Sequence, residues 1–434
     1  MAGSGLTGVL LVGGASARFG APKALARLRG ETLAERAWRT LGEACDERIA
    51  VGKGELDLPF DVLVEPPQPH APIAGVLAGL RAAVNETAVF LPVDCPLVTP
   101  DLLRGLGEQR AVPQTGPLPG SYSKDDLPEL ERRLAAGDYS LRALNPRTVA
   151  VDPTLLLDVD TRRDLALVAV VAWARAHHDV RALVLVGSLA RADTPADEWS
   201  DIDTIALVDD PALYLADDTW VAELGRPVLT FVEQTELGGV FERRVLLEGG
   251  IDVDVVLAPA SAADLLLDVA PAVLRRGFLV LHDELGLGPR LEDAAAAAPG
   301  EALPAAAELE QVCADLWYHG LWTAKKLRRG ELWTALECLD SHMRHRLLAL
   351  LRWRAVLDGR PVWHGARFVE RWAGEPRELL GATFARYDER ELACALWEML
   401  DLAGHLEVEL RARLGVPACD RSEAARLIAD VQPR

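Results

Sequence analysis

Residues 10–23 read LLVGGASARFGAPK, so that an apolar strand runs directly into a glycine-rich loop that ends in a lysine. Strand-like segments alternate here with amphipathic, helix-like ones: strands at 8–12, 48–51, 61–64 and 88–93, and helices at 33–41 and 73–83. This alternation predicts an α/β fold with a largely parallel, doubly wound sheet. Ligands bind such sheets at the carboxyl ends of the strands, where the glycine-rich loop would lie.

A second pattern of strand and turn lies in the middle of the chain, at LVLVGSLAR (183–191) and WSDIDT (199–204). A helical run at 163–177 precedes it, and strands are expected at 182–186, 201–208, 227–232 and 251–257. The Ala/Pro-rich stretch 292–308 is either a linker or a capped helix, and the pattern after it is helical and rich in tryptophan. We therefore expect three domains: residues 1–163, an α+β core at 164–291 and a helical bundle at 305–434.

The composition is typical of a globular chain with an acidic surface. The 434 residues are 50% hydrophobic and have a formal net charge of −20. Such a charge repels a phosphate backbone and attracts cationic small molecules, so nucleic acid is not an expected partner. The six cysteines show no C-x-x-C spacing, and no apolar run is long enough to span a bilayer. We expect a cytoplasmic protein with no membrane association and no zinc or disulfide framework.

The loop after the first strand contains the residue types that bind phosphate. Glycines let backbone N–H groups approach phosphate oxygens, and basic side chains add positive charge. The residues concerned are Gly13, Gly14, Ser16, Arg18, Gly20 and Lys23. The strand at 88–93 leads to Asp94, where a Mg²⁺ that bridges nucleotide phosphates needs an oxygen ligand. A glycine after a strand is common in tight turns, but its combination with Lys23 and Asp94 favours a nucleotide-binding site.

These residues resemble the molybdenum cofactor guanylyltransferases (MobA-like NTP transferases), over about the first 163 residues. Further similar segments are APIAGVLAGL at 71–80, with Gly75 on the base side, GDYSLRAL at 137–144 and LDVDT at 157–161. The resemblance implies a Rossmann-like domain in which Arg18 and Lys23 hold the triphosphate, Lys23 acts in catalysis and Asp94 binds Mg²⁺. The family's Met-Gly-x-Asp-Lys is FGAPK here, which leaves the base open between guanine, cytosine and others. Asp160 is either a second metal ligand or a solvated loop residue.

The middle of the chain predicts a second site, which is built on paired carboxylates. Asp201 and Asp203 stand at i and i+2 on a strand, so both side chains leave the same face and can share a divalent cation. The strand at 251–257 again has alternate carboxylates, Asp252 and Asp254. A third aspartate from that strand would complete a metal site and could accept the proton of an attacking hydroxyl.

A Gly-Ser turn precedes the paired aspartates. Gly187 and Ser188 can present a backbone N–H and a hydroxyl to phosphate oxygens, with Arg191 nearby. The whole pattern resembles the aminoglycoside 6-adenylyltransferases, which are streptomycin-modifying members of the DNA-polymerase-β-like superfamily. The resemblance continues into the helical region, at LWY (316–318), AKKLRRGELW (324–333) and residues 342–353.

This second resemblance implies roles for individual residues. Ser188 would contact phosphate, and Asp201 and Asp203 would bind Mg²⁺. Asp254 would be a third ligand or the general base, with Asp252 as the alternative because the register of that strand is open. An acidic cleft would suit a polycationic acceptor.

The two resemblances together imply a bifunctional, Mg²⁺-dependent enzyme that transfers NMP from an NTP to small-molecule acceptors and releases pyrophosphate. The first site would use GTP or CTP and a molybdopterin-like or sugar-phosphate acceptor. The second would use ATP and an aminoglycoside-like polyamine or polyol. Two alternatives stay open at this point: only one site is active, or the chain is a nucleotide-binding sensor or interaction protein.

Overall fold

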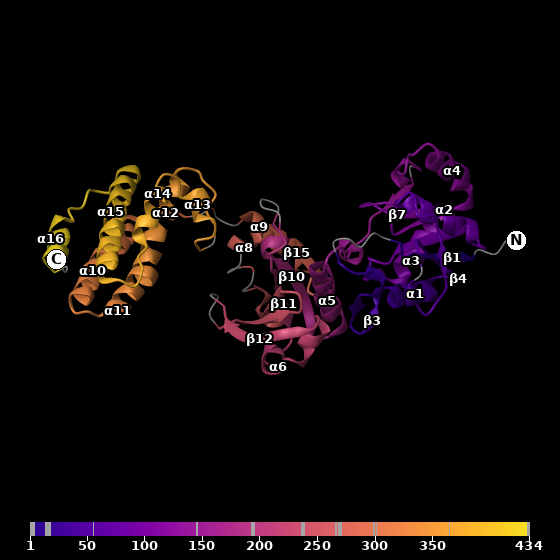
Figure 1. Ribbon diagram of the computed structural model, residues 1–434, viewed down its shortest axis with the longest axis horizontal. Helices are drawn as coiled ribbons and strands as arrows, with labels where there is room; N and C mark the ends of the chain where they lie inside the picture. The colour runs from indigo at the N-terminus through magenta and orange to yellow at the C-terminus, as the bar shows by residue number, and fades with distance from the viewer. Residues whose placement is uncertain are drawn as a thin grey trace. The chain divides into compact units, whose positions relative to one another are not determined.

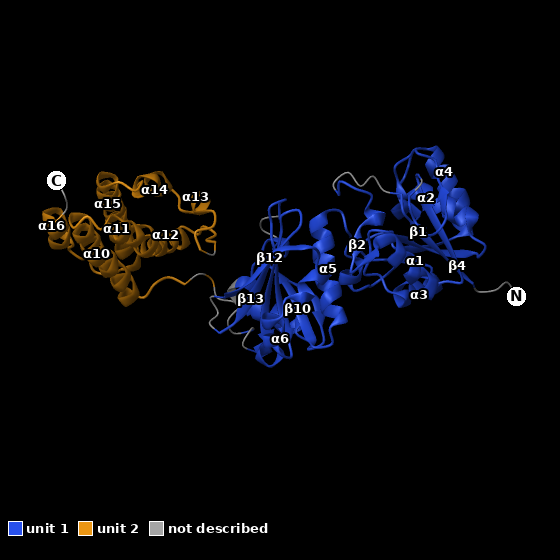
Figure 2. Cartoon of the chain, turned by 60° about the horizontal axis from the view of Figure 1, so that its bottom comes forward, with its two compact units in different colours: residues 1–298 blue, residues 299–434 orange. Residues whose placement is uncertain are grey.

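The computed structural model describes residues 5–13, 19–54, 56–144, 146–191, 196–235, 239–264, 267, 271–297, 300, 302–363 and 365–431 (Figure 1). The chain forms two compact units, residues 1–298 and 299–434, which Figure 2 colours blue and orange. Unit 1 contains two large β-sheets, and the described part of unit 2 is built of helices. Among these residues, no helix combines the length and the apolar character needed to cross a membrane.

The first sheet has the strand order β5-β4-β1-β6-β8. Its strands are β1 (Leu6–Leu11), β4 (Glu47–Gly52), β5 (Val62–Val64), β6 (Thr87–Pro92) and β8 (Gly120–Ser123). The first four strands in this order run parallel, and β8 is antiparallel to β6. Because β1 and β6 are parallel neighbours, the loops that follow them lie at the same edge of the sheet.

Helices cover both faces of the first sheet, which confirms the doubly wound α/β fold. They are α1 (Leu33–Ala44), α2 (Pro72–Ala82), α3 (Pro100–Gln109) and α4 (Leu127–Ala135). Successive side chains of a strand point to opposite faces. Leu10 accordingly lies in the core formed with α1 and α3, and Val9 lies in the core formed with α2 and α4. Short strands complete the domain: β2 (Arg27–Leu28), β3 (Glu31–Thr32), β7 (Ala111–Pro113) and β9 (Arg147–Val149).

The second sheet has the order β12-β13-β14-β11-β10-β15. Its strands are β10 (Val180–Val186), β11 (Ile202–Val208), β12 (Pro227–Gln234), β13 (Phe241–Leu247), β14 (Ile251–Pro259) and β15 (Leu279–Asp283). β11 and β14 are parallel, and the other neighbouring pairs are antiparallel. Sequence patterns had not predicted β13 or β15. β11 is a central strand rather than an exposed edge, because both β10 and β14 pair with it.

The helices of this second half are α5 (Arg162–Ala176), α6 (Pro211–Ala216), α8 (Pro271–Leu274) and α9 (Gly288–Ala297). α5 begins at a capping box of Thr161 and Asp164 and packs its apolar residues on one face of the sheet. Trp173 of α5 is fully buried and stacks on Trp220, with ring centroids 4.7 Å apart. α8 and α9 contribute to the core on the opposite face.

Unit 2 is a helical bundle, as the sequence predicted. Its helices are α10 (Ala306–Arg328), α11 (Leu332–Glu337), α12 (Arg344–Leu357), α13 (Val369–Trp372), α14 (Arg377–Leu380), α15 (Glu389–Leu414) and α16 (Ser422–Val431). A π-helical turn, Cys338–Met343, joins α11 to α12. The long helices α10, α12 and α15 share one hydrophobic core, which includes Leu316, Leu347 and Leu396.

The packing of α5 generates a stability prediction. Trp173→Ala removes a fully buried indole from the contact between α5 and the second sheet. Deleting such a side chain leaves a cavity, so we expect the free energy of unfolding to fall by about 3 to 5 kcal/mol in denaturant titrations. Trp199→Ala is the matched control, since Trp199 is 85% exposed and its removal should leave stability unchanged. Equal effects of the two substitutions would contradict this account of the core.

Candidate active sites

The first site gathers charged groups at the carboxyl edge of the first sheet. Lys23 lies in a 3-10 turn after the glycine-rich loop, and its Nζ is 3.3 Å from Asp94 Oδ2 and 2.5 Å from Asp160 Oδ1. Asp94 follows β6, and its carbonyl oxygen accepts a 2.8 Å hydrogen bond from the N–H of Val159. Three segments that are distant in sequence therefore meet at Lys23. Asp160, which the sequence left open between ligand and solvated loop, is part of this cluster.

The two carboxylates control the charge of Lys23. Burial alone would lower the pKa of Lys23, but hydrogen bonding to Asp160 and the charges of Asp94 and Asp160 outweigh burial and raise this pKa. The ammonium group therefore stays charged at neutral pH. A fixed positive charge beside a strand-end carboxylate suits the binding of a nucleotide phosphate together with its cation.

Glu65 is a candidate binding residue that the sequence analysis missed. Its Oε1 is 3.5 Å from Lys53 Nζ, and its buried Oε2 has no hydrogen-bond partner among the residues that the structure describes. A Cβ atom added at Gly13 would lie 3.1 Å from Oε1, and one added at Gly75 would lie 3.6 Å from Oε2. Burial raises the pKa of Glu65. Gly13 and Gly75, which the sequence predicted as nucleotide-binding residues, therefore both lie against the unsatisfied carboxyl group of Glu65. The one sequence feature that points to Glu65 is its position directly after β5.

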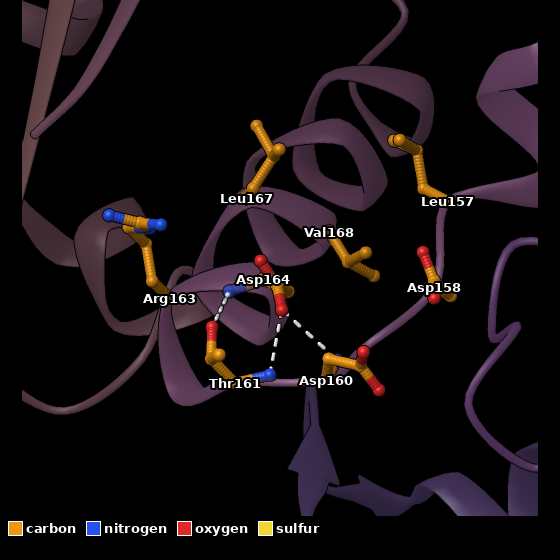
Figure 3. A pocket seen from close by; sticks show the side chains of 8 residues that line it. All are labelled: Leu157, Asp158, Asp160, Thr161, Arg163, Asp164, Leu167 and Val168. Atoms are coloured by element: carbon orange, nitrogen blue, oxygen red, sulfur yellow. Dashed lines mark hydrogen bonds between the residues drawn. The ribbon is translucent and has the colours of Figure 1, made fainter. Parts of the chain in front are cut away.

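A pocket of about 340 Å³ adjoins Asp160 at the start of α5 (Figure 3). Its lining residues are Leu157, Asp158, Asp160, Thr161, Arg163, Asp164, Leu167 and Val168. Asp164 accepts hydrogen bonds from the backbone N–H groups of Asp160 and Thr161, which holds the turn that presents Asp160 to Lys23. Gly14, Ser16 and Arg18 lie outside the described residues, so their phosphate-binding roles stay predictions. Gly20 is described and has a φ of +77°, which favours glycine.

The second site brings together three carboxylates of the second sheet. Asp201, Asp203 and Asp254 each offer an oxygen atom, and these atoms all lie within 4.8 Å of one another. Register explains this proximity, since β11 and β14 run parallel with Asp203 opposite Asp254. Asp201 directly precedes β11 rather than lying on it. Asp252, the alternative third carboxylate, is exposed two residues before the buried Asp254.

The Gly-Ser turn lies against this cluster. Gly187 directly follows β10 and has a φ of +70°, and a Cβ atom added there would lie 2.0 Å from Asp203 Oδ2. Ser188 is buried, and its Oγ finds no hydrogen-bond partner within the described ranges. Arg191 follows the turn, and its backbone N–H donates to the carbonyl oxygen of Gly187. An unsatisfied hydroxyl beside a carboxylate cluster can donate to a phosphate oxygen.

Arg244 of β13 is the partner of Asp254, and the sequence analysis did not find it. Its Nη1 is 2.8 Å from Asp254 Oδ2, and it also pairs with Glu233 and Glu242. Burial is the main cause that raises the pKa of Asp254 to about 6; Arg244 opposes the shift, and the charges of Glu242, Asp201 and Asp252 add to it. A carboxyl group with this pKa can both bind a cation and accept a proton near neutral pH.

The ligand types in the two sites fit Mg²⁺. Hard divalent cations prefer carboxylate oxygens, and a bound cation would relieve the mutual repulsion of Asp201, Asp203 and Asp254. In the first site Asp94 and Asp160 are the carboxylates in position to hold one. In the second site, Arg163 of α5 holds the loop that precedes Asp201. Its guanidinium group donates hydrogen bonds to the carbonyl oxygens of Asp197 and Ser200.

Both parts of the chain match families of known proteins. A family model described as "MobA-like NTP transferase domain" matches residues 8–149, and one described as "Streptomycin adenylyltransferase" matches residues 162–426. The molybdenum cofactor guanylyltransferase of Burkholderia orbicola is 32% identical over 173 residues, which cover 34% of this chain and 84% of the relative. A "Probable molybdenum cofactor guanylyltransferase" of Chloroflexus aggregans is 30% identical over 193 residues, with coverages of 38% and 93%. The crystal structure of an aminoglycoside 6-adenyltransferase from Bacillus subtilis matches with 18% identity and a TM-score of 0.30, and covers 62% of this chain and 97% of that one.

The fold and these matches define a nucleotidyltransferase. In its N-terminal part the chain belongs to the MobA-like NTP transferases, and over residues 162–426 it belongs to the streptomycin adenylyltransferases. Both resemblances drawn from the sequence are thereby confirmed.

The close approach of Gly187 to Asp203 generates a prediction for the second site. Gly187→Ala places a methyl group on Asp203 Oδ2, so the carboxylate must move. Because a displacement of about 1 Å can lower turnover about 100-fold, we expect such a loss in kcat/KM at the second site. Gly250→Ala is the matched control, since Gly250 also has a positive φ, +75°, but nothing lies within 4 Å of an added Cβ. An equal loss in both variants would attribute the effect to backbone strain.

The raised pKa of Asp254 generates a prediction on stability. In the fold, the neutral form of this group is favoured, so the wild type loses stability as the pH rises from about 4 to above the folded pKa of about 6. Asp254→Asn does not titrate, and Arg244 keeps its two other partners. We therefore expect the free energy of unfolding of the variant to exceed that of the wild type by about 1 to 3 kcal/mol above pH 6 in the presence of a chelator. In acid, the two free energies should be equal. Denaturant titrations across this pH range measure the difference, with Asp252→Asn as control. A variant less stable than the wild type at high pH would contradict the burial argument.

Proposed function

We propose that this chain is a bifunctional nucleotidyltransferase, in which each site transfers NMP from an NTP to a small-molecule acceptor and releases pyrophosphate. The observation that supports the proposal most directly is the cluster of Asp201, Asp203 and Asp254 beside the unsatisfied Ser188 hydroxyl. Binding alone does not require a third, buried carboxylate with a raised pKa, whereas such a group is suited to accept the proton of an acceptor hydroxyl. NTPs as substrates are consistent with a cytoplasmic location.

In the second site, the chain's own residues would position the reactants. Ser188 would donate its hydroxyl to a phosphate oxygen, and the backbone of the Gly187 turn would approach the triphosphate closely because no side chain intervenes. Asp254 would accept the proton of the acceptor hydroxyl as that oxygen attacks the α-phosphorus. Asp201 and Asp203 would hold Mg²⁺, which neutralises charge on the phosphates when bound.

ATP and an aminoglycoside-like polyamine or polyol are the substrates we propose for this second site. A cationic acceptor fits the electrostatics, because Asp252, Glu242 and Glu233 lie on the strands beside the site and the chain has a net charge of −20. The family description "Streptomycin adenylyltransferase" supports the same acceptor class.

In the first site, Lys23 would hold the triphosphate, together with the glycine-rich loop that precedes it. Asp94, with Asp160, would bind Mg²⁺. Glu65 would accept a hydrogen bond from the base or sugar beside Gly75. Adenine, guanine and cytosine all have an amino group that could donate to Glu65, so this contact does not select the base. We propose GTP or CTP as the nucleotide because of the family resemblance. The relatives' names favour GTP and a molybdopterin-like acceptor, with a sugar phosphate as the second choice.

A pyrophosphate-release screen tests both halves of the proposal. Full-length protein with Mg²⁺ would be combined with ATP, GTP or CTP and with molybdopterin, sugar phosphates or aminoglycosides. Since each carboxylate set serves its own site, we expect Asp94→Asn to abolish turnover of one acceptor and Asp201→Asn/Asp203→Asn to abolish turnover of another. Losses of at least about 100-fold are expected for removal of metal ligands.

Matched controls are available for both variants. Asp101→Asn changes an exposed aspartate of α3, and Asp252→Asn changes the exposed aspartate of β14. Both controls should keep both activities. Turnover at only one site would support a single active centre. Saturable NTP binding without acceptor-dependent release would favour a nucleotide sensor instead.

A further inference from the structure

Unit 2 contains a cluster of two histidines and one carboxylate that the proposed nucleotidyl transfer does not use. Asp315 Oδ1 lies 2.5 Å from His319 Nδ1 and 2.7 Å from His342 Nε2. The two imidazole rings are neighbours, with centroids 3.9 Å apart and planes inclined by 45°. One ligand-type atom from each of the three residues lies within 4.8 Å of the others. The cluster therefore converges on one point rather than forming an extended chain of contacts.

Local backbone geometry produces this convergence. Asp315 and His319 are at i and i+4 on α10, so their side chains lie on the same face one turn apart. His342 comes from the π-helical turn Cys338–Met343. A π-turn holds one more residue than an α-turn and so changes the direction of the side chains around it, and such turns occur frequently at functional sites. Leu339 and Met343 of the same turn are buried, which anchors it against α10.

Arg346 of α12 holds one oxygen atom of Asp315 in place. Arg346 Nε is 2.8 Å from Oδ2, whereas Oδ1 faces the two histidines. The carboxylate thus has one oxygen held in place by Arg346 and the other directed at the imidazoles.

We propose that Asp315, His319 and His342 bind a divalent transition metal, with Zn²⁺ as the representative ion. Two imidazoles and one carboxylate are ligands that Zn²⁺ and similar ions prefer, in contrast to the all-oxygen sets that Mg²⁺ prefers. In a tetrahedral site, zinc-ligand distances of about 2.1 Å require the ligand atoms to lie about 3.4 Å apart, so the nitrogen atoms would need to move away from Asp315 Oδ1 by less than about 1 Å. Side-chain rotation provides this, because His319 and His342 are 28% and 37% exposed.

Three protein ligands leave a fourth coordination position open to water, which is the arrangement of accessible zinc sites rather than closed structural ones. Metal binding would also connect α10 to the turn before α12.

Equilibrium dialysis of the full-length protein with Zn²⁺, in excess Mg²⁺ to occupy the carboxylate sites, tests the proposal. We expect the wild type to bind one equivalent of Zn²⁺ that the His319→Gln/His342→Gln variant lacks, with affinity reduced about 100-fold or more. The chain offers a matched control in Asp401 and His405, which have the same i,i+4 spacing on α15 but belong to no three-residue cluster among the residues that the structure describes. His405→Gln should bind Zn²⁺ as the wild type does, and so should Asp201→Asn/Asp203→Asn.

Two further readouts keep the test independent of folding defects. Zn²⁺ should raise the thermal unfolding temperature of the wild type but not of the double histidine variant, because a ligand that binds only the folded state stabilises it. Co²⁺ bound to the wild type should give a visible absorption spectrum typical of histidine ligation. Zn²⁺ binding that the histidine variant retains, or that Asp201→Asn/Asp203→Asn abolishes, would overturn the proposal, as would wild-type protein that binds no Zn²⁺ under these conditions.

Discussion

The parallel pairing of β11 with β14 is the constraint on which the second site depends. It sets Asp203 opposite Asp254 and so holds like charges close together at one end of a buried sheet. Apolar residues of both strands stabilise this pairing, and Arg244 on the next strand offsets part of the repulsion. Burial is the main cause of the raised pKa of Asp254, and the charges of Glu242, Asp201 and Asp252 add to it. The fold holds these carboxylates together despite their mutual repulsion. A cation that binds there would relieve this repulsion, so the site favours cations.

The first site balances the negative charges of its carboxylates in a different way. Its carboxylates, Asp94 and Asp160, already have a counter-charge in Lys23, which lies between segments from three parts of the domain. The two sites therefore differ in the charge that they present. One presents a fixed positive charge together with carboxylates, and the other presents excess negative charge and an unsatisfied serine hydroxyl. A common reaction class on two unrelated folds is consistent with these different starting electrostatics.

The helical unit adds a third kind of charged cluster, and its ligand chemistry is distinct. Imidazoles replace carboxylates as the main donors, and a π-turn rather than strand register brings them together. These three clusters thus arise from three separate structural features: a loop that closes on the end of a strand, the register of a sheet, and a π-turn between two helices. Each feature brings together residues that no local pattern connects.

Local patterns in the sequence determined much of this protein. Periodicity predicted the doubly wound sheet and the helical bundle, and glycine placement with alternating aspartates indicated both nucleotidyltransferase regions. Tertiary structure alone decided which distant groups meet: Asp160 with Lys23, Arg244 with Asp254, Glu65 with two glycines, and His342 with Asp315. The choice between Asp252 and Asp254 as neighbour of Asp203 also needed the register of β14. The physical reason is that hydrophobic periodicity reports only which face of an element is buried, whereas pairing between elements depends on packing over the whole chain.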